Sequence, residues 1–353
     1  MEANVLPFRI LKIKMRSSFI SGVLLLFVSL SVLGQEVFTN PVRDGADPWV
    51  FEKDGEYYYC ASHGGGITVS KSTKLTDQGE MVQVWKSPES GWNSANIWAP
   101  EIHHIDGRWF IYYTGGSKPG SPFIHQRSGV LRSTTDDAFG SYEDMGMLYT
   151  GDNIQDPHSV VWAIDLTPWH HRGQWYAIWS GWEENRDTDK TEQHLYIAEM
   201  SNPYTISSNR VKLTSPVEAW ETGGPLDLIE GPQMLERNGK TFIIYSTRES
   251  WLKEYRLGQL ILRDGSDPLL PESWEKKGPV FMGTNEVLGA GHCSFAKSPD
   301  GTEDWILYHS KKTEQPGWDR DIRLQPFTWY PDGSPNFGTP LPAGVAIPVP
   351  SGE

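Results

Sequence analysis

Hydrophobic and polar residues alternate in short runs along most of this chain, and the runs are rich in aromatic side chains. Runs of five to eight residues recur between clusters of glycine, proline, asparagine and aspartate, as is typical of β-strands and the turns between them. No window of 11 or more residues shows the 3.6-residue period of an amphipathic helix. The pattern therefore predicts an all-β protein.

Five of the predicted strands follow a turn that ends in glycine. The turns, separated by 52, 66, 66 and 62 residues, are Asp54-Gly55, Asp106-Gly107, Arg172-Gly173, Asn238-Gly239 and Asp300-Gly301. A repeat of roughly 60 residues built on a hairpin is typical of a β-propeller with one blade per repeat. A β-sandwich, the alternative, usually has turns every ~8–12 residues without such a period. We therefore predict a five-bladed β-propeller over residues 35–338.

One position recurs eight or nine residues before each turn glycine. The residues found there are Asp47, Trp98 and Ala99, Asp165, Glu230, and His292. Because the innermost strand of each propeller blade lines the central channel, we expect these side chains to converge on one axis. Two carboxyl groups on opposite sides of a glycosidic bond are the groups that hydrolyse it, and acids held close together have pKa values that are pushed apart. The convergence indicates a glycosidase.

Each acid also has a plainer interpretation. Asp47 precedes a proline and fits a turn, Asp165 could cap a loop, and Glu230 could be a solvated loop acid. Their shared offset from the turn glycine favours the channel for all three. Asp156, in QDPH, competes with Asp165 for the third acidic position but lies 17 residues before its turn glycine.

Six motifs together resemble glycoside hydrolase family 43. In order, over residues 40 to about 338, they are GADPWV, NIWAPEIH, WAIDLT followed by GQWYAIWSGW, IEGPQML, GAGHCSF and RLQPFTW. The resemblance implies a five-bladed propeller and an inverting arabinofuranosidase, arabinanase or β-xylosidase. It also implies that Asp47 is the general base, Glu230 the proton-donating acid, and Asp165 the acid that tunes and orients the donor.

The resemblance and the blade geometry suggest further residues around the substrate. Trp98 is expected to stack on a sugar ring, the alternative being a core residue, and Arg323 in RLQPF matches a family arginine that reaches the sugar hydroxyls. His292 is expected near the channel centre, where the related histidine can contact a cation or a water. Because calcium prefers several oxygen ligands, a structural histidine beside the acids is the favoured interpretation. Ser180 is expected on the pocket rim, at the end of a second strand.

Residues 1–34 are predicted to be a secretory signal peptide, with Met15 as an alternative start. Basic residues precede an apolar run of 14 residues, Phe19 to Val32, which is shorter than the ~20 residues of a membrane-spanning helix. Without this segment the chain has 27 basic and 44 acidic residues, a net charge of −17 that disfavours nucleic acids and anionic membranes as partners. We expect a secreted or periplasmic protein without a membrane span in its mature form.

The proline-rich tail, residues 339–353, is expected to be extended or loosely attached.

The combined prediction is an enzyme that removes terminal α-L-arabinofuranosyl residues from a pentose-containing polysaccharide or oligosaccharide. A β-xylosidase is an alternative, although xylosidases of this family commonly carry a second domain for which the chain leaves no room. An arabinanase is another, although the polar segments 115–129 and 181–192 could close its groove into a pocket. A catalytically inactive carbohydrate-binding propeller is the alternative from a different class, and three channel acids argue against it. No organic cofactor is implied, and a structural calcium ion is left open.

Overall fold

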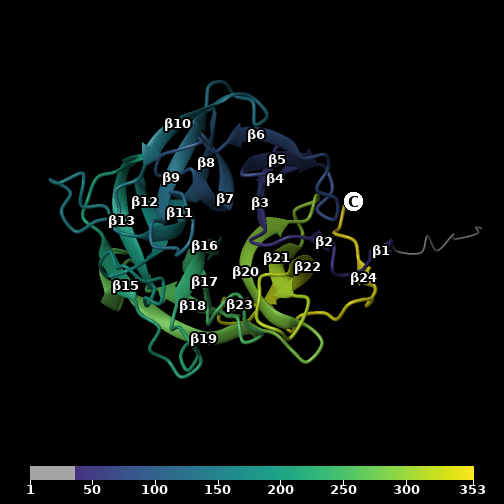
Figure 1. Ribbon diagram of the computed structural model, residues 1–353. Coiled ribbons are helices and arrows are strands. Elements are labelled where there is room, and N and C mark those ends of the chain that lie inside the picture. Colours follow the sequence, from purple (N-terminus) through teal and green to yellow (C-terminus); the bar gives the residue numbers. More distant parts are fainter. Residues whose placement is uncertain (1–35) are drawn as a thin grey trace, which may run out of the picture. The chain divides into compact units, whose positions relative to one another are not determined.

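The computed structural model describes residues 36–353, so the predicted signal peptide lies outside the described residues. The described residues form six antiparallel sheets, five of which are placed around a common centre (Figure 1), with β3, β7, β11, β16 and β20 labelled nearest to that centre. This arrangement confirms the predicted all-β, five-bladed propeller. One short 3₁₀ helix, Pro271–Ser273, precedes the last strand of the fourth blade. Within residues 36–353, no helix has the length and apolar character needed to cross a bilayer.

Each of the first four blades is a consecutive meander, and the third carries an extra edge strand. Blade 1 contains β3 (Trp49–Lys53), β4 (Glu56–His63), β5 (Gly66–Ser72) and β6 (Val82–Lys86). Blade 2 contains β7 (Ala95–Ile105), β8 (Arg108–Gly116), β9 (Arg127–Ser133) and β10 (Tyr142–Met147). Blade 3 contains β11 (Ala163–His171), β12 (Gln174–Gly181), β13 (His194–Asn202), β14 (Thr205–Ile206) and β15 (Val211–Thr214). Blade 4 contains β16 (Ile229–Arg237), β17 (Lys240–Thr247), β18 (Arg256–Leu262) and β19 (Trp274–Met282).

Blade 5 closes the ring with a strand from the other end of the chain. Its members are β20 (Leu288–Lys297), β21 (Asp304–Lys311), β22 (Arg320–Trp329) and β2 (Arg43–Asp44), with β23 (Pro335–Asn336) also paired to β22. The side chain of Asn40 reinforces the closure, because its amide donates to the carbonyl of Leu324 at 2.8 Å and its oxygen accepts the Leu324 N–H at 2.9 Å. Blade 1 is thereby held beside blade 5.

The C-terminal tail belongs to the propeller, so the expectation of a loosely attached tail is wrong. Strand β24 (Ile347–Pro348) pairs with β1 (Val37–Phe38), and the Ile347 side chain is buried in the core of the adjoining blades. The carboxylate of Glu353 accepts the N–H groups of Leu75 at 2.5 Å and Thr76 at 3.0 Å. Buried apolar surface and satisfied backbone donors hold the proline-rich segment in place.

The turn glycines have the conformation that a tight hairpin requires. In the first four blades both turn residues have positive φ, for example 55° at Asp54 and 78° at Gly55, as in a type I′ turn. In blade 5 the connection spans residues 298–303, between Lys297 and Asp304. This longer turn explains why His292 precedes its turn glycine by nine residues, whereas Asp47 and Asp165 do so by eight.

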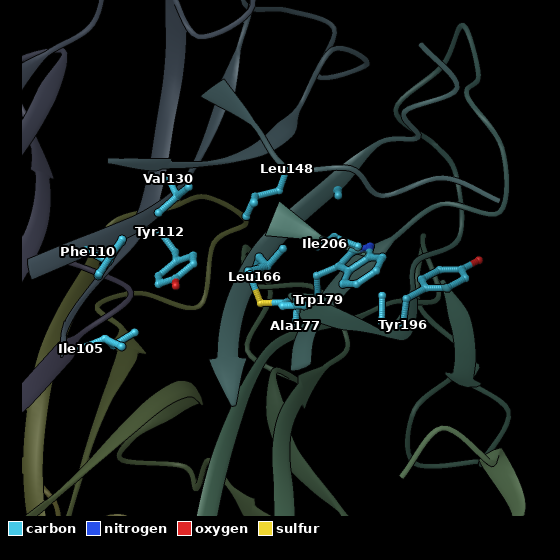
Figure 2. Close-up of a cluster of buried hydrophobic side chains, with 13 residues drawn as sticks. Ile105, Phe110, Tyr112, Val130, Leu148, Leu166, Ala177, Trp179, Tyr196 and Ile206 are labelled. Carbon is cyan, nitrogen blue, oxygen red and sulfur yellow. The ribbon is translucent and has the colours of Figure 1, made fainter. Parts of the chain in front are cut away.

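The cores lie between neighbouring blades. Figure 2 shows the cluster between blades 2 and 3, in which Tyr112 and Val130 face Ala177, Trp179 and Tyr196. Fully burying a large apolar side chain contributes about 1.5–3 kcal/mol, so these clusters hold the blades in register around the axis. Both cysteines, Cys60 and Cys293, are buried free thiols.

Candidate active site

The recurring position found in the sequence is a recurring backbone conformation. Five residues, one in or just before each inner strand, have left-handed φ values between 40° and 55°: Asp47, Ala99, Asp165, Gly231 and His292. In blades 2 to 5 the pairing with the second strand shifts register at this point. Non-glycine residues adopt this conformation at a cost and are concentrated at functional sites. The bulge interrupts the alternation of the strand and aims side chains into the channel.

Blade 4 differs from the others, because its bulge residue is Gly231 and the acid Glu230 precedes it. A Cβ atom on Gly231 would lie only 3.1 Å from Nδ1 of His292. Glycine therefore allows both the positive φ of 55° and the close approach of the histidine ring.

Side chains on the second strands hold the bulge of the following blade. The N–H of Asp165 donates to Oγ1 of Thr114 at 3.1 Å, and the N–H of His292 donates to Oγ of Ser246 at 2.8 Å. The N–H of Asp47 donates to Nδ1 of His309 at 3.2 Å, which continues the pattern across the ring closure. The bulges are thus fixed by their neighbours before any ligand binds.

Ser180 occupies the same second-strand position in blade 3. Its side chain is fully buried, and its hydroxyl donates to the carbonyl of Ile229 at 2.6 Å. It does not line the cavity described below, contrary to the expectation that it contacts substrate. Its place in the pattern makes it a link between blades 3 and 4, next to Glu230.

The three predicted acids come together at one cavity of about 480 Å³. Asp47, Asp165 and Glu230 all line it, and so do Trp98 and His292. The three acids belong to blades 1, 3 and 4, Trp98 belongs to blade 2, and His292 belongs to blade 5. Each of the five blades therefore contributes one of these residues. A concave site with convergent carboxyl groups is what hydrolysis of a small glycoside requires.

Asp47 is surrounded by nitrogen atoms. Its Oδ1 lies 3.2 Å from Nη1 of Arg320, 3.2 Å from Nδ1 of His309 and 3.4 Å from Nδ1 of His292. Burial by itself raises the pKa of Asp47, but the positive charge of Arg320 is the largest of the opposing effects, and the pKa lies well below its usual range.

The guanidinium is the permanent charge in this group. Burial lowers the pKa of His292 and lowers the pKa of His309 to about 3, so both imidazoles are neutral near pH 7. Arg320 therefore holds Asp47 ionised, as a general base must be.

Glu230 has the opposite environment. Burial, together with the negative charge of Asp47, raises the pKa of Glu230 to about 7, while hydrogen bonding by Tyr255 and Ser250 and the charge of Arg320 act in the other direction. The Tyr255 hydroxyl donates to Oε1 of Glu230 at 2.8 Å. A carboxyl group that still carries its proton near neutrality is suited to protonate a departing oxygen.

Asp165 is buried and hydrogen-bonded to the backbone beside the donor. Its Oδ2 accepts the N–H of Gly231 at 3.0 Å, which ties the blade 3 acid to the residue after Glu230. Burial, followed by the charges of Glu230 and Asp47, raises the pKa of Asp165 well above its usual range. Burial and the charge of Asp47 raise the pKa of Glu230, and the charge of Glu230 in turn contributes to the raised pKa of Asp165. Two carboxyl groups coupled in this way titrate as a pair.

Arg323, expected to reach the substrate, points elsewhere. Its guanidinium is buried and donates to Oγ of Ser310 at 2.6 Å and to the carbonyl of Leu341 at 3.1 Å, so it braces the tail. Arg320 takes the position beside Asp47 instead. An odd offset of three residues along β22 places the two side chains on opposite faces of the strand. The sequence gives one indication that Arg320 is a site residue: it begins a strand of the same blade as His292, at the end of that blade where His292 lies.

Of the two remaining candidates, Trp98 lies at the cavity and Asp156 does not. Trp98 is half-buried at the cavity wall and packs edge-on against Phe123, with ring centroids 5.1 Å apart. Asp156 lies in an exposed loop, where its carboxylate accepts the N–H of His158 at 3.0 Å, and it does not line the cavity.

Among residues 36–353, no three His, Cys, Asp or Glu side chains are grouped as metal ligands, and a ring nitrogen of His292, Nδ1, lies 3.4 Å from Oδ1 of Asp47.

Comparison with known proteins agrees with this geometry. Residues 38–335 match the model of glycosyl hydrolases family 43. The chain is 33% identical over 326 residues to an extracellular exo-α-(1→5)-L-arabinofuranosidase of Streptomyces avermitilis, an alignment that covers 87% of this chain and 64% of that protein. It is 31% identical over 288 residues to an enzyme of the same name from Streptomyces chartreusis, covering 79% of this chain and 84% of the relative.

A solved structure shows the same fold at comparable identity. The crystal structure of an α-L-arabinofuranosidase from Lactobacillus brevis superposes with a TM-score of 0.77 at 30% identity, covering 87% of this chain and 98% of that one. The family model spans most of the chain and includes Asp47, Asp165 and Glu230. The chain therefore belongs to glycosyl hydrolases family 43.

Proposed function

We propose that this protein is an inverting glycosidase that removes terminal α-L-arabinofuranosyl residues from arabinose-containing polysaccharides or oligosaccharides. One observation carries the proposal: a single cavity holds Asp47 beside the Arg320 guanidinium at 3.2 Å and Glu230 with a pKa raised to about 7. A carboxylate that is ionised near pH 7 and a carboxyl group that keeps its proton near that pH, both in one cavity, are suited to be the base and the acid of this reaction.

In the proposed reaction, Asp47 accepts a proton from water as the water oxygen bonds to the anomeric carbon. Glu230 donates its proton to the glycosidic oxygen as the bond between that oxygen and the anomeric carbon breaks. Attack from the face opposite to the leaving group inverts the anomeric configuration. Asp47 then loses its proton to solvent and Glu230 regains one. The reaction needs water and carboxyl groups alone, and we propose that it proceeds without an organic cofactor.

The choice of arabinofuranose rests on the relatives. Those reported above are named as α-L-arabinofuranosidases, two of them as extracellular exo-enzymes. A cavity of about 480 Å³ is of the size of small-ligand pockets, which fits one sugar unit with part of the next. The extracellular relatives and the predicted signal peptide together support secretion, and a periplasmic location is the alternative.

Hydrolysis of an aryl α-L-arabinofuranoside and an aryl β-D-xyloside, measured side by side, tests the proposal. We expect kcat/KM for the arabinofuranoside to be at least about tenfold higher, and Asp47→Asn to lose about 10²–10⁴-fold of that activity because no group remains to activate water. Asp156→Asn, an exposed acid outside the cavity, is the matched control and should retain full activity. Preference for the xyloside would indicate a β-xylosidase. Binding of arabino-oligosaccharides without any hydrolysis would indicate a carbohydrate-binding propeller.

A further inference from the structure

Four aromatic side chains form a continuous row along the cavity toward its mouth. Trp98 contacts Phe123, Phe123 contacts Trp318, and Trp318 contacts Trp251, with ring centroids 5.1, 6.3 and 5.7 Å apart. All four line the cavity, yet they come from β7 and from the connections β8–β9, β21–β22 and β17–β18. Loops of blades 2, 4 and 5 therefore meet at the cavity that holds the acids.

The outer half of this row consists of Trp318 and Trp251, and its backbone is held by hydrogen bonds while Trp318 is open to solvent. Trp318 is 55% exposed, a high value for the largest apolar side chain. The residue before it is bonded on both sides, since the Gly317 N–H donates to the carbonyl of Trp251 at 2.9 Å and its carbonyl accepts Nζ of Lys311 at 2.6 Å. The backbone of Phe123, the second ring of the row, is also held, because its carbonyl accepts Nε1–H of Trp162 at 2.7 Å. An exposed, braced tryptophan at the edge of a cavity is suited to contact a ligand.

The row ends on the side of the proton donor. Trp251 directly follows Ser250, which lines the cavity and whose hydrogen bonding lowers the pKa of Glu230. The acid of a glycosidase faces the leaving group, whereas the base faces the attacking water. A group departing from Glu230 toward solvent therefore passes Trp251 and Trp318.

The chemistry of the surface specifies the leaving group. Flat aromatic rings bind the C–H face of a sugar, and charged groups beside them serve its hydroxyls. Lys190 and Asp189 also line the cavity, and Nζ of Lys190 lies 5.9 Å from the centre of the Trp251 ring. We propose that Trp318, supported by Trp251, is the binding surface for a sugar leaving group, which makes the protein selective for arabinofuranose attached to another sugar. This inference rests on the proposed function.

The test compares two substrates that share the arabinofuranosyl group and differ in the leaving group: α-(1→5)-L-arabinobiose and methyl α-L-arabinofuranoside. We expect Trp318→Ala to lower kcat/KM for arabinobiose roughly three- to tenfold, mainly through KM, and to leave the methyl glycoside unchanged. Trp318→Phe, which keeps an aromatic face, should recover most of the loss. Tyr330→Ala is the matched control, because Tyr330 is 51% exposed and does not line the cavity.

Two results would overturn the inference. An equal loss of kcat/KM on both substrates would show that Trp318 shapes the pocket for the cleaved sugar. An unchanged kcat/KM on both substrates would show that the Trp318 ring does not bind the leaving group. Failure of the proposed function is seen separately, as absence of hydrolysis of the methyl and aryl arabinofuranosides by the unmodified protein. Thermal unfolding of each variant identifies any loss that comes from misfolding.

Discussion

Asp47 and Arg320 lie 273 residues apart in the chain, and the structure places Nη1 of Arg320 3.2 Å from Oδ1 of Asp47. Strand β2 joins the sheet of blade 5 directly before Asp47, and its pairing with Ile322 and Asp321 in β22 brings the two ends of the ring together. Closure of the propeller therefore also assembles the general base. The charge state of Asp47 depends on this closure, because burial alone would raise its pKa.

Replacing Arg320 by Gln should move the acidic limb of the pH profile of kcat/KM. Asp47 works when ionised, so activity falls as the pH drops through its pKa. Removing the neighbouring cation raises that pKa, and we expect the limb to move to higher pH by about 1–3 units. Arg323→Gln is the control: it should leave the profile in place and lower the melting temperature, since Arg323 braces the tail. A profile unchanged in Arg320→Gln would contradict the role of Arg320.

Replacing Glu230 by Gln should affect substrates according to their leaving groups. A 2,4-dinitrophenyl group departs with little protonation, so its arabinofuranoside should lose far less activity than an arabino-oligosaccharide. The alkaline limb, expected near pH 7 from the raised pKa of Glu230, should disappear. Equal losses on both substrates would remove Glu230 as the proton donor.

Replacing Asp165 by Asn should shift the alkaline limb to lower pH. The amide oxygen of the substituted side chain can still accept the Gly231 N–H, so the backbone contact is preserved while the second ionisable group of the pair is lost. Repulsion between the two carboxylates delays the last deprotonation of the pair, and its loss lets Glu230 ionise earlier. Apparent pKa values from kcat/KM measure this shift. Full activity with an unmoved limb would limit Asp165 to holding the bulge of blade 4.

The stereochemistry of the product tests the pairing of Asp47 with Glu230. Direct attack by water activated by Asp47 predicts that the first product from an α-L-arabinofuranoside is the β-anomer. Proton NMR during the first minutes of a reaction at high enzyme concentration distinguishes it before mutarotation. Initial formation of the α-anomer would mean retention and would make one carboxylate a nucleophile.

The packed tail should contribute to stability. Ile347 is 2% exposed in the core, so Ile347→Ala should lower the free energy of unfolding by about 2–5 kcal/mol and the melting temperature by several degrees. Val345→Ala, in the same tail but 40% exposed, should have little effect. Calorimetry of both variants makes the comparison. Equal melting temperatures would show that the tail adds nothing to the fold.

The sequence by itself determined the features that depend on neighbouring residues. A type I′ turn is encoded by two adjacent residues such as Asp54 and Gly55, and a strand by the alternation on either side of it. The distance from the turn to the bulge is also local, so a constant offset was sufficient to find Asp47 and Asp165 and, with one residue of displacement, Glu230 and His292. Five such hairpins predicted the propeller and the convergence of the acids.

Only the tertiary structure decided which distant side chains surround those acids. Arg320 and Arg323 lie on one strand, and the direction in which each points follows from how β22 sits against β21 and β2. Ser180 was assigned to the rim because its strand runs toward the pocket, but the neighbouring carbonyl of Ile229 captures its hydroxyl. The low pKa of Asp47 and the raised pKa of Glu230 likewise depend on burial and on charged groups that are distant in the chain. Electrostatic interactions and burial act through space, and the spacing of residues along a chain does not contain them.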